Sequence, residues 1–266
     1  MISLKRNARG ELVEAIGHRS RNIYNPQQDE KFRLSRGKFS DFLQCRRCFY
    51  LDRVCGLIEP GLPGWSLNQA TDDLLKKEFD QNRITKTPHR LFAKFGLNNV
   101  VPYQHPDMDK WRDALHHGLE FDYPDSNLTL TGGIDDLWFD QNTDEVIVID
   151  YKSQANSNPV ETESYLAAVH HQGYKIQLDF YAYLLHNMGY KVAPYGYFYV
   201  CNADKSASAF NGQLLFEETL VPYKLNFEWV DSQIVALLKL LKSEEMPDSN
   251  PSCENCAYAR QRNRLE

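Results

Sequence analysis

"VIVIDYKS", residues 146–153, joins four β-branched aliphatic residues to an aspartate and a lysine. The aliphatic run predicts a buried strand, because β-branched side chains favour strands and apolar side chains leave water. Asp150 and Lys152, at the end of the run, carry charges that are costly to bury unless each has a partner. We therefore expect this strand to end in a functional site.

The residues before this strand predict the other arm of a β-hairpin. "LTLTGGIDDLWFD" (128–140) is followed by the turn-forming residues "QNTD" (141–144) and then by "EVIVIDYKS" (145–153). A turn centred in the middle of "QNTD" places Asp135 directly across from Asp150, with about 5 Å between their Cβ atoms.

The predicted hairpin brings three charged side chains together. Because side chains alternate along a strand, Asp135, Asp150 and Lys152 share one face, whereas Asp136 and Tyr151 point to the opposite face. Two carboxylates at this distance repel each other and raise each other's pKa unless a cation lies between them. Carboxylate oxygens suit Mg²⁺ or Mn²⁺, so the pattern predicts a divalent metal site.

The rest of the sequence predicts helices before and after a sheet. The expected helices cover 34–57 (capped by Ser35), 66–84, 108–122, 162–189 and 226–243, and two further strands cover 195–202 and 213–223. This order indicates the α/β class, with α+β as the alternative. We expect a polar, basic N-terminal segment over 1–32 and a single domain over 33–266, with a cysteine-bearing tail from about residue 247.

Three motifs together resemble a known family. "GGIDD" (132–136), "VIDYKS" (148–153) and "QLDFY" (177–181) are similar to the G-x-x-D, D/E-x-K and Q-x-x-x-Y pattern of the PD-(D/E)XK nuclease superfamily, in its RecB-like branch. The resemblance implies a restriction-endonuclease-like mixed sheet flanked by helices. It also implies site roles for six residues: Asp135, Asp150 and the carbonyl of Tyr151 at the metal, Lys152 as the motif lysine, and Gln177 and Tyr181 as the helix motif.

One expected ligand has no clear counterpart. Many RecB-like nucleases carry a histidine or glutamate ligand on a helix before the hairpin, and "LNQATDDLLKKEFD" (67–80) has no histidine. Asp72 is the best substitute, with Asp73 and Glu78 as competitors and a solvated acidic helix face as the alternative. Tyr181 could likewise be a core aromatic residue.

The cysteines form a second pattern. Cys45 and Cys48 in "CRRC", with Cys253 and Cys256 in "CENC", make a C-x-x-C pair of pairs that suits a tetrahedral thiolate site for Zn²⁺. Cys55 and Cys201 are interpreted as bystanders, and four buried thiols without a metal remain the alternative.

The family resemblance offers a second cofactor at this site. In the iron–sulfur CRISPR-associated nucleases, one N-terminal and three C-terminal cysteines hold a 4Fe–4S cluster. Cys45, Cys253 and Cys256 fit that layout, but Arg262 stands where the last cysteine is expected, so Cys48 would have to replace it. Zinc and an iron–sulfur cluster both stay open, as a clasp that joins the N-terminal helix to the C-terminal tail.

Composition and charge limit the class of protein. The 266 residues are 42% hydrophobic and 25% charged, and no run of about 18 apolar residues predicts a membrane span. The net charge is −6, but residues 1–53 hold twelve Lys or Arg against six acidic residues. This segment could face a phosphate backbone, or could simply be solvated. "MISLKRNARG" (1–10) lacks an apolar signal region, so we expect a cytoplasmic protein with reduced thiols.

Together with the charged residues of the hairpin, the family resemblance implies a Mg²⁺-dependent deoxyribonuclease in DNA processing, repair or defence. The expected partner is single- or double-stranded DNA. Because no P-loop is present, a helicase or other motor would have to be another chain. The alternative is a non-enzymatic nucleic-acid-binding module on the same fold, although such a module would be expected to lack one of Asp135, Asp150 and Lys152.

Overall fold

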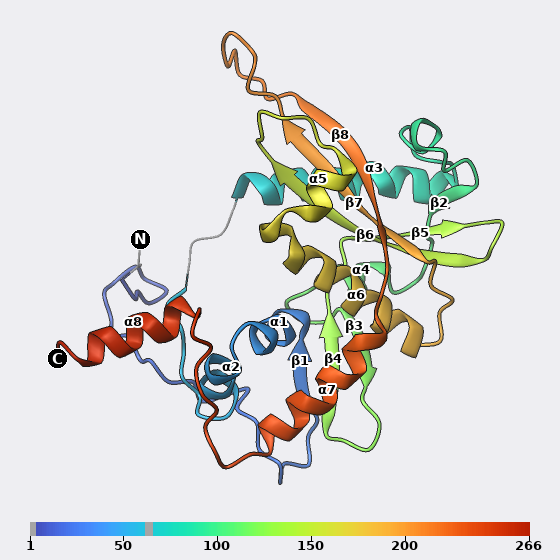
Figure 1. Cartoon of the computed structure of the whole chain (residues 1–266). Helices are drawn as coiled ribbons and strands as arrows, with labels where there is room; N and C mark the ends of the chain where they lie inside the picture. Colours follow the sequence, from blue (N-terminus) through green and yellow to red (C-terminus); the bar gives the residue numbers. More distant parts are fainter. Residues whose placement is uncertain (1–3, 62–65) are drawn as a thin grey trace. The chain divides into compact units, whose positions relative to one another are not determined.

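The computed structural model describes residues 4–61 and 66–266, and the chain folds into two compact units. Of the described residues, 4–61, 122–130 and 231–266 form the first unit, and 66–121 and 131–230 form the second. Figure 1 shows the elements along the chain. None of the described helices has both the length and the apolar character that crossing a bilayer requires.

The second unit is built on a mixed five-stranded sheet. Its order is β2-β5-β6-β7-β8, in which β6 and β7 run parallel and the other neighbours run antiparallel. The strands are β2 (Val100–Pro102), β5 (Asp136–Asp140), β6 (Glu145–Gln154), β7 (Tyr195–Ala203) and β8 (Phe216–Lys224). A parallel pair requires a crossover connection, and the helical segment between β6 and β7 provides it.

The register of the β5–β6 hairpin is confirmed. Asp136 pairs with Ile149 and Leu137 with Val148, as the predicted turn requires. Val146 to Tyr151 are all buried, so both faces of the central strand β6 are covered. Side chains therefore leave β6 alternately toward two different packing layers.

Helices of the second unit pack on each face of this strand. Phe79 of α3 (Ser66–Thr85) stacks on Tyr151, with ring centroids 5.8 Å apart. On the opposite face, Gln177 of α6 (Gln172–Asn187) contacts Asp150. Figure 1 shows α3 and α6 on either side of the sheet. The even-numbered residues at the end of β6 thus face α6, and the odd-numbered Tyr151 faces α3.

Two helix predictions in this unit are wrong in part. The stretch 162–189 forms α5 (Thr162–Ala167), the 3₁₀ turn η2 (Val169–His171) and α6 rather than one helix. The extended backbone of Ala168, with ψ of 129°, interrupts the first helix. The predicted helix over 108–122 ends at Arg112 as α4 (Met108–Arg112), and its last four residues form the strand β3 (Leu119–Asp122). A short 3₁₀ turn, η1 (Ala93–Phe95), completes the second unit.

The first unit carries the cysteine-bearing helices. Its elements are β1 (Phe32–Ser35), α1 (Arg36–Gln44), α2 (Arg46–Arg53), α8 (Glu254–Asn263) and parts of β3, β4 (Leu128–Gly132) and α7 (Glu228–Leu241). The second sheet has the order β1-β4-β3. Ser35 caps α1 as predicted, since its hydroxyl accepts a hydrogen bond from the Lys38 backbone N–H.

The single helix predicted over 34–57 is wrong at Cys45. This residue has φ of −152° and ψ of 106°, so it ends α1 and becomes the N-cap of α2. No glycine or proline marks the break in the sequence. Its structural consequence is that a new helix begins at the first cysteine of the "CRRC" motif.

Candidate active site

The end of β6 carries the charged residues that the sequence predicted to converge. The Asp150 side chain is fully buried and forms an ion pair with the Lys152 ammonium. Asp135 immediately precedes β5, and its Oδ2 accepts a hydrogen bond of 2.7 Å from the Tyr151 backbone N–H. All three residues belong to the second unit. The structure therefore brings Asp135, Asp150 and Lys152 together, as the hairpin register requires.

The helix motif contacts this group directly. Gln177 Nε2 donates to Asp150 Oδ1 at 2.7 Å and to the Tyr181 hydroxyl at 3.2 Å. Because Gln177 and Tyr181 lie four residues apart, they share one face of α6. Asp150 Oδ2, by contrast, accepts no hydrogen bond of regular geometry from the described residues and has the Lys152 charge beside it.

Two glycines allow close packing here, one at the end of β4 against α6 and one against Ala114. A Cβ atom on Gly132 would lie 2.7 Å from Cε1 of the Tyr181 ring, and one on Gly133 would lie 2.3 Å from the Ala114 Cβ. Both distances are far below van der Waals contact. The Tyr181 ring of the Q-x-x-x-Y motif therefore leaves no room for a side chain at Gly132, the glycine of the G-x-x-D motif.

The electrostatics of the group indicate an excess of negative charge. Burial and the neighbouring Asp150 charge raise the pKa of Asp135 to about 7. Burial acts to lower the pKa of Lys152, but the charges of Asp150 and Asp135 outweigh it and raise that pKa above its usual value. Lys152 therefore remains an ammonium ion at neutral pH. Crowded, buried carboxylate oxygens of this kind fit a divalent cation, which would offset their repulsion.

Asp72 lies close enough to Asp135 for their charges to interact. Burial, followed by the Asp135 charge, raises the pKa of Asp72, and its Oδ2 is paired with Lys76 at 2.7 Å. Within residues 4–61 and 66–266, the four cysteines alone bring three or more ligand atoms within 4.8 Å of one another. Asp72 is thus a neighbour of Asp135 but does not form such a group with Asp135 and Asp150.

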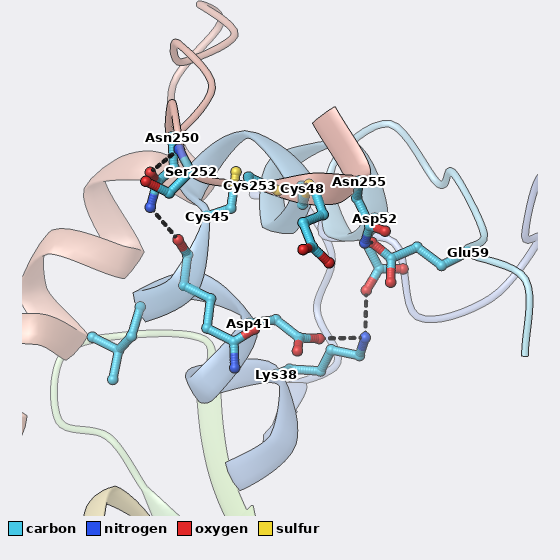
Figure 2. Close-up of a pocket in the computed structure, with 13 residues that line it drawn as sticks. Lys38, Asp41, Cys45, Cys48, Asp52, Glu59, Asn250, Ser252, Cys253 and Asn255 are labelled. Carbon is cyan, nitrogen blue, oxygen red and sulfur yellow. Dashed lines mark hydrogen bonds and ion pairs between the residues drawn. The ribbon is translucent and has the colours of Figure 1, made fainter. Parts of the chain in front are cut away.

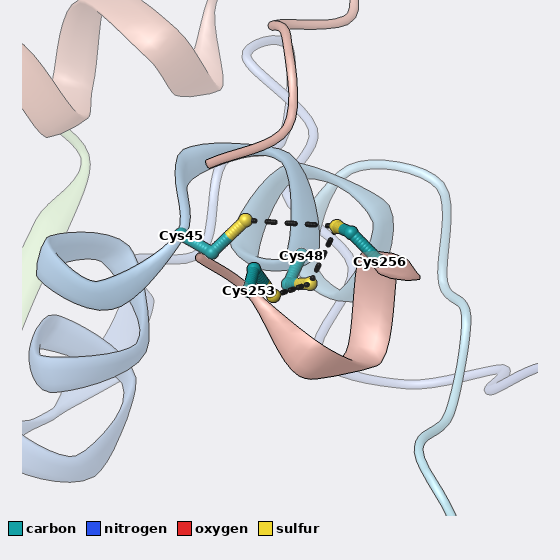
Figure 3. Close-up of side chains that lie close together, drawn as sticks. All are labelled: Cys45, Cys48, Cys253 and Cys256. Carbon is teal, nitrogen blue, oxygen red and sulfur yellow. Dashed lines mark hydrogen bonds between the residues drawn. The ribbon is translucent and has the colours of Figure 1, made fainter. Parts of the chain in front are cut away.

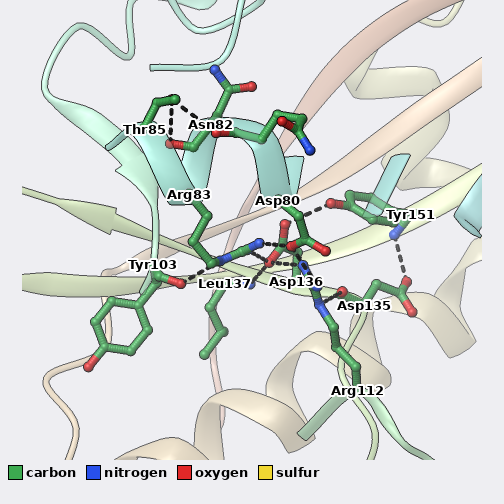
Figure 4. Close-up of polar contacts among 11 residues, drawn as sticks. Asp80, Asn82, Arg83, Thr85, Tyr103, Arg112, Asp135, Asp136, Leu137 and Tyr151 are labelled. Atoms are coloured by element: carbon green, nitrogen blue, oxygen red, sulfur yellow. Dashed lines mark hydrogen bonds and ion pairs between the residues drawn. The ribbon is translucent and has the colours of Figure 1, made fainter. Parts of the chain in front are cut away.

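A buried ion-pair network behind the site was missed by sequence reasoning (Figure 4). The Asp136 carboxylate has no exposed surface; its Oδ1 pairs with Arg83 and, at 2.9 Å, with Arg112, and its Oδ2 accepts from the Tyr151 hydroxyl at 2.8 Å. Arg112 Nε also donates to the Asp135 carbonyl at 3.1 Å. The network therefore fixes the backbone of Asp135 and the side chain of Tyr151, which both border the candidate site.

The sequence did contain one sign of this network. Side-chain alternation sends Asp136 to the face opposite Asp135, where an apolar strand packs on α3, and an acid on such a face requires cationic partners. The partners themselves lie 53 and 24 residues away along the chain, in α3 and α4. No local pattern could identify them.

The four cysteines predicted as a cluster do converge, within the first unit (Figure 3). The Sγ atom of Cys48 lies 3.4 Å from that of Cys256 and 3.6 Å from that of Cys253. The Sγ atoms of Cys45 and Cys256 lie 3.8 Å apart. Cys45 and Cys253 are the N-cap residues of α2 and α8. Two helix N-termini therefore face the sulfurs, where their dipoles favour thiolate.

The surroundings of the cluster affect the ionisation of one thiol. Burial acts to raise the pKa of Cys45, but hydrogen bonds from the backbone of Cys48 and Asn250 outweigh it, and the pKa falls to about 7. A hollow of about 600 Å³ lies beside the sulfurs (Figure 2), in which Lys38 bridges Asp41 at 2.7 Å and Asp52 at 2.9 Å. The thiolate form of Cys45 is thus accessible at neutral pH, whereas burial raises the pKa of Cys48 and of Cys256.

The two remaining cysteines lie apart from the cluster. Cys55 is exposed, and Cys201 is buried in the hydrophobic core of the second unit. Neither belongs to the group of four.

Comparison with known proteins identifies a family and a similar solved structure. The family model of the PD-(D/E)XK nuclease superfamily matches residues 64–261, which is most of the chain. No curated protein matches the sequence. Among solved structures, the crystal structure of a protein named "Putative exonuclease" from Eubacterium rectale is similar at 14% identity, with a TM-score of 0.43, over 92% of this chain and 94% of that one.

Proposed function

The chain belongs to the PD-(D/E)XK nuclease superfamily, and from this premise we propose that it is a RecB-like, Mg²⁺- or Mn²⁺-dependent deoxyribonuclease in DNA processing, repair or defence. One observation carries the proposal. Asp135, Asp150 and Lys152 converge on one buried face, where burial and carboxylate crowding raise the pKa of Asp135 to about 7. A divalent cation relieves this crowding, and such an ion can activate water for the hydrolysis of phosphodiester bonds.

Each side chain has a distinct role in this proposal. Asp135 and Asp150 would hold the ion, with the Tyr151 carbonyl and Asp72 as further oxygen donors. When bound, the ion supplies an activated water and stabilises charge on the transition state. Lys152, as an ammonium, neutralises the negative charge that develops on the scissile phosphate.

The helix motif orients this chemistry. Gln177 fixes one oxygen of Asp150 by its 2.7 Å hydrogen bond, and Tyr181 accepts a second hydrogen bond from the same amide. Asp150 is therefore held in one rotamer, which leaves its second oxygen toward Lys152. Such preorganisation reduces the reorganisation needed when substrate arrives.

The charge of the N-terminal segment supports a nucleic-acid substrate, which we propose to be DNA. Twelve Lys and Arg residues in the first 53 positions supply positive charge in a chain whose net charge is −6. Contacts between such residues and phosphates release counterions, so binding should weaken as salt concentration rises.

The proposal is tested by incubating purified protein with end-labelled linear DNA and closed circular DNA in Mg²⁺, Mn²⁺ or EDTA. We expect cleavage with either metal and none with EDTA. Circles that survive while linear DNA is degraded would indicate an exonuclease, and their conversion would indicate an endonuclease. Retention of DNA without cleavage under every condition would instead support the nucleic-acid-binding module.

At the four-cysteine site we propose Zn²⁺ rather than an iron–sulfur cluster. Zn–S bonds of about 2.3 Å in a tetrahedron separate the sulfurs by about 3.8 Å. Three of the sulfur pairs lie 3.4 Å, 3.6 Å and 3.8 Å apart, and all four sulfurs lie within 4.8 Å of one another. A 4Fe–4S cluster attaches each thiolate to a different iron, so its sulfurs lie farther apart. The sulfur distances therefore favour a single ion.

Replacing Cys253 with serine is expected to remove this ion and to destabilise the protein by about 2 kcal/mol, or roughly 4–8 °C in Tm for a chain of this size. The site would fasten α8 to α2, which lie more than 200 residues apart in sequence. Metal analysis should find about one zinc per wild-type chain. The matched control is Cys55→Ser, because Cys55 is exposed, whereas the buried Cys201 would confuse the comparison. A brown protein that contains iron, or six freely titrating thiols in the native protein, would contradict the zinc site.

A further inference from the structure

A hydroxyl group beside the candidate active site lacks a partner. In the part of the second unit that the structure describes, three buried side-chain polar atoms have no hydrogen bond: Trp138 Nε1, Asp150 Oδ2 and the Tyr165 hydroxyl. Asp150 Oδ2 is compensated by the Lys152 charge. Tyr165 is only 5% exposed, and its hydroxyl forms no hydrogen bond with another described residue.

Tyr165 is packed against the residues that flank the active-site strand. Its ring lies 5.8 Å from that of Phe198, which pairs with Asp150 across the β6–β7 register. In a parallel pair, residues in register present their side chains on the same face of the sheet. Tyr165 therefore lies on the Asp150 face of the sheet, in the layer that also contains α6.

A stack of rings leads from Tyr165 to Lys152. The Tyr165 and His171 rings are 4.0 Å apart, and His171 stacks on Tyr174 at 5.1 Å. The Lys152 Nζ lies 4.5 Å above the Tyr174 ring. The positions of Tyr165 and Lys152 are thus linked by direct side-chain contacts.

His171 also holds Tyr165 through its backbone. The His171 Nδ1 lies 2.8 Å from the Tyr165 carbonyl oxygen, so Nδ1 carries the proton and donates it there. Burial, together with His170 and Lys152, lowers the pKa of His171, which keeps the ring neutral. The unpartnered hydroxyl is thus held on a rigid support rather than on a free side chain.

The hydroxyl is a donor at any pH near neutrality. Burial, and then the Asp150 and Tyr174 charges, raise the pKa of Tyr165 above its ordinary value. A hollow of about 190 Å³ borders Tyr165 and His171, along the segment that follows β6. At about 30 Å³ per water molecule, it has room for a small polar group and a few waters.

We propose that Tyr165 is a further catalytic residue, whose hydroxyl donates a hydrogen bond to a phosphate oxygen of the DNA strand bound beside Lys152. This inference rests on the proposed nuclease function. An unpaired buried hydroxyl destabilises the free protein, and a charged acceptor that reaches it recovers this loss on binding. Phosphate oxygens are acceptors without donors, so they complement a tyrosine hydroxyl and an ammonium ion together.

The test is Tyr165→Phe, which removes the hydroxyl and keeps the ring stack. Its affinity for a short DNA oligonucleotide, measured in EDTA, should fall about 10- to 100-fold, as expected for a lost hydrogen bond to a charged group. In Mg²⁺, kcat/KM for cleavage should fall by at least the same factor. The Tm of the free variant should equal or exceed that of the wild type, because the lost hydroxyl had no partner.

The matched control is Tyr197→Phe, since Tyr197 lies on β7 next to Phe198 and packs against the opposite face of the sheet. It should bind and cleave as the wild type does. Wild-type affinity and kcat/KM in Tyr165→Phe would overturn the inference while leaving the proposed function intact. A lowered Tm with unchanged binding would also overturn it, since the hydroxyl would then be structural. A wild-type protein that neither binds nor cleaves DNA would overturn the proposed function and this inference with it.

Discussion

Replacing Lys152 with alanine is expected to lower the rate of DNA cleavage by about 10²- to 10⁴-fold, which is the range for a positioned group acting on charge or protons in the transition state. The reason is that the Lys152 ammonium pairs with Asp150 on the face that would receive the scissile phosphate. Its raised pKa keeps it charged, so it acts as a cation rather than as a base.

The measurement is single-turnover cleavage of end-labelled DNA at saturating Mg²⁺. Circular dichroism should show an intact fold for the variant. Lys191→Ala is the matched control, because Lys191 is an exposed lysine of the same unit that contacts Glu145 and the Thr143 carbonyl. If Lys152→Ala cleaves at the wild-type rate, Lys152 is not part of the active site.

Replacing Asp136 with alanine should instead affect stability, with a loss of about 3–5 kcal/mol, the range for removing one partner of a buried ion pair. Arg83 and Arg112 would each lose a buried carboxylate partner, and the Tyr151 hydroxyl would lose its acceptor. Each uncompensated group bears the cost of burial without its hydrogen bond.

Thermal or urea denaturation measures this effect, which corresponds to roughly 6–20 °C in Tm for a chain of this size. Asp140→Ala, at the half-buried end of the same strand, is the control and should change stability by less than about 1 kcal/mol. Equal stability of Asp136→Ala and wild type would show that the network does not hold the hairpin.

The hairpin and its register could be predicted because they depend on local rules. Strand alternation and a turn of four residues place Asp135 across from Asp150, and the observed pairing of Asp136 with Ile149 confirms that register. The clustering of the cysteines could also be predicted, since two C-x-x-C motifs in a chain with no other such pair favour one shared site. In each case the information lies within a few residues of the motif.

The features that could not be predicted depend on distant residues. The chain leaves the helical conformation at Cys45 although its neighbours favour a helix, and the Cys45 sulfur lies beside that of the distant Cys256. Leu119, the first residue of β3, continues an apparently helical pattern, but becomes a strand because it pairs within a sheet. Tertiary contacts override propensity at both positions.

The central claim is that the Asp135 and Asp150 carboxylates form a site for a divalent ion, and calorimetric titration of Mn²⁺ into metal-stripped protein tests it most directly. The wild type should bind Mn²⁺, whereas Asp135→Asn and Asp150→Asn, which keep the side-chain shape, should each lose that binding step. The four cysteines are unchanged in all three proteins, so the difference reports on the carboxylates alone. The same binding isotherm in wild type and both variants would contradict the account.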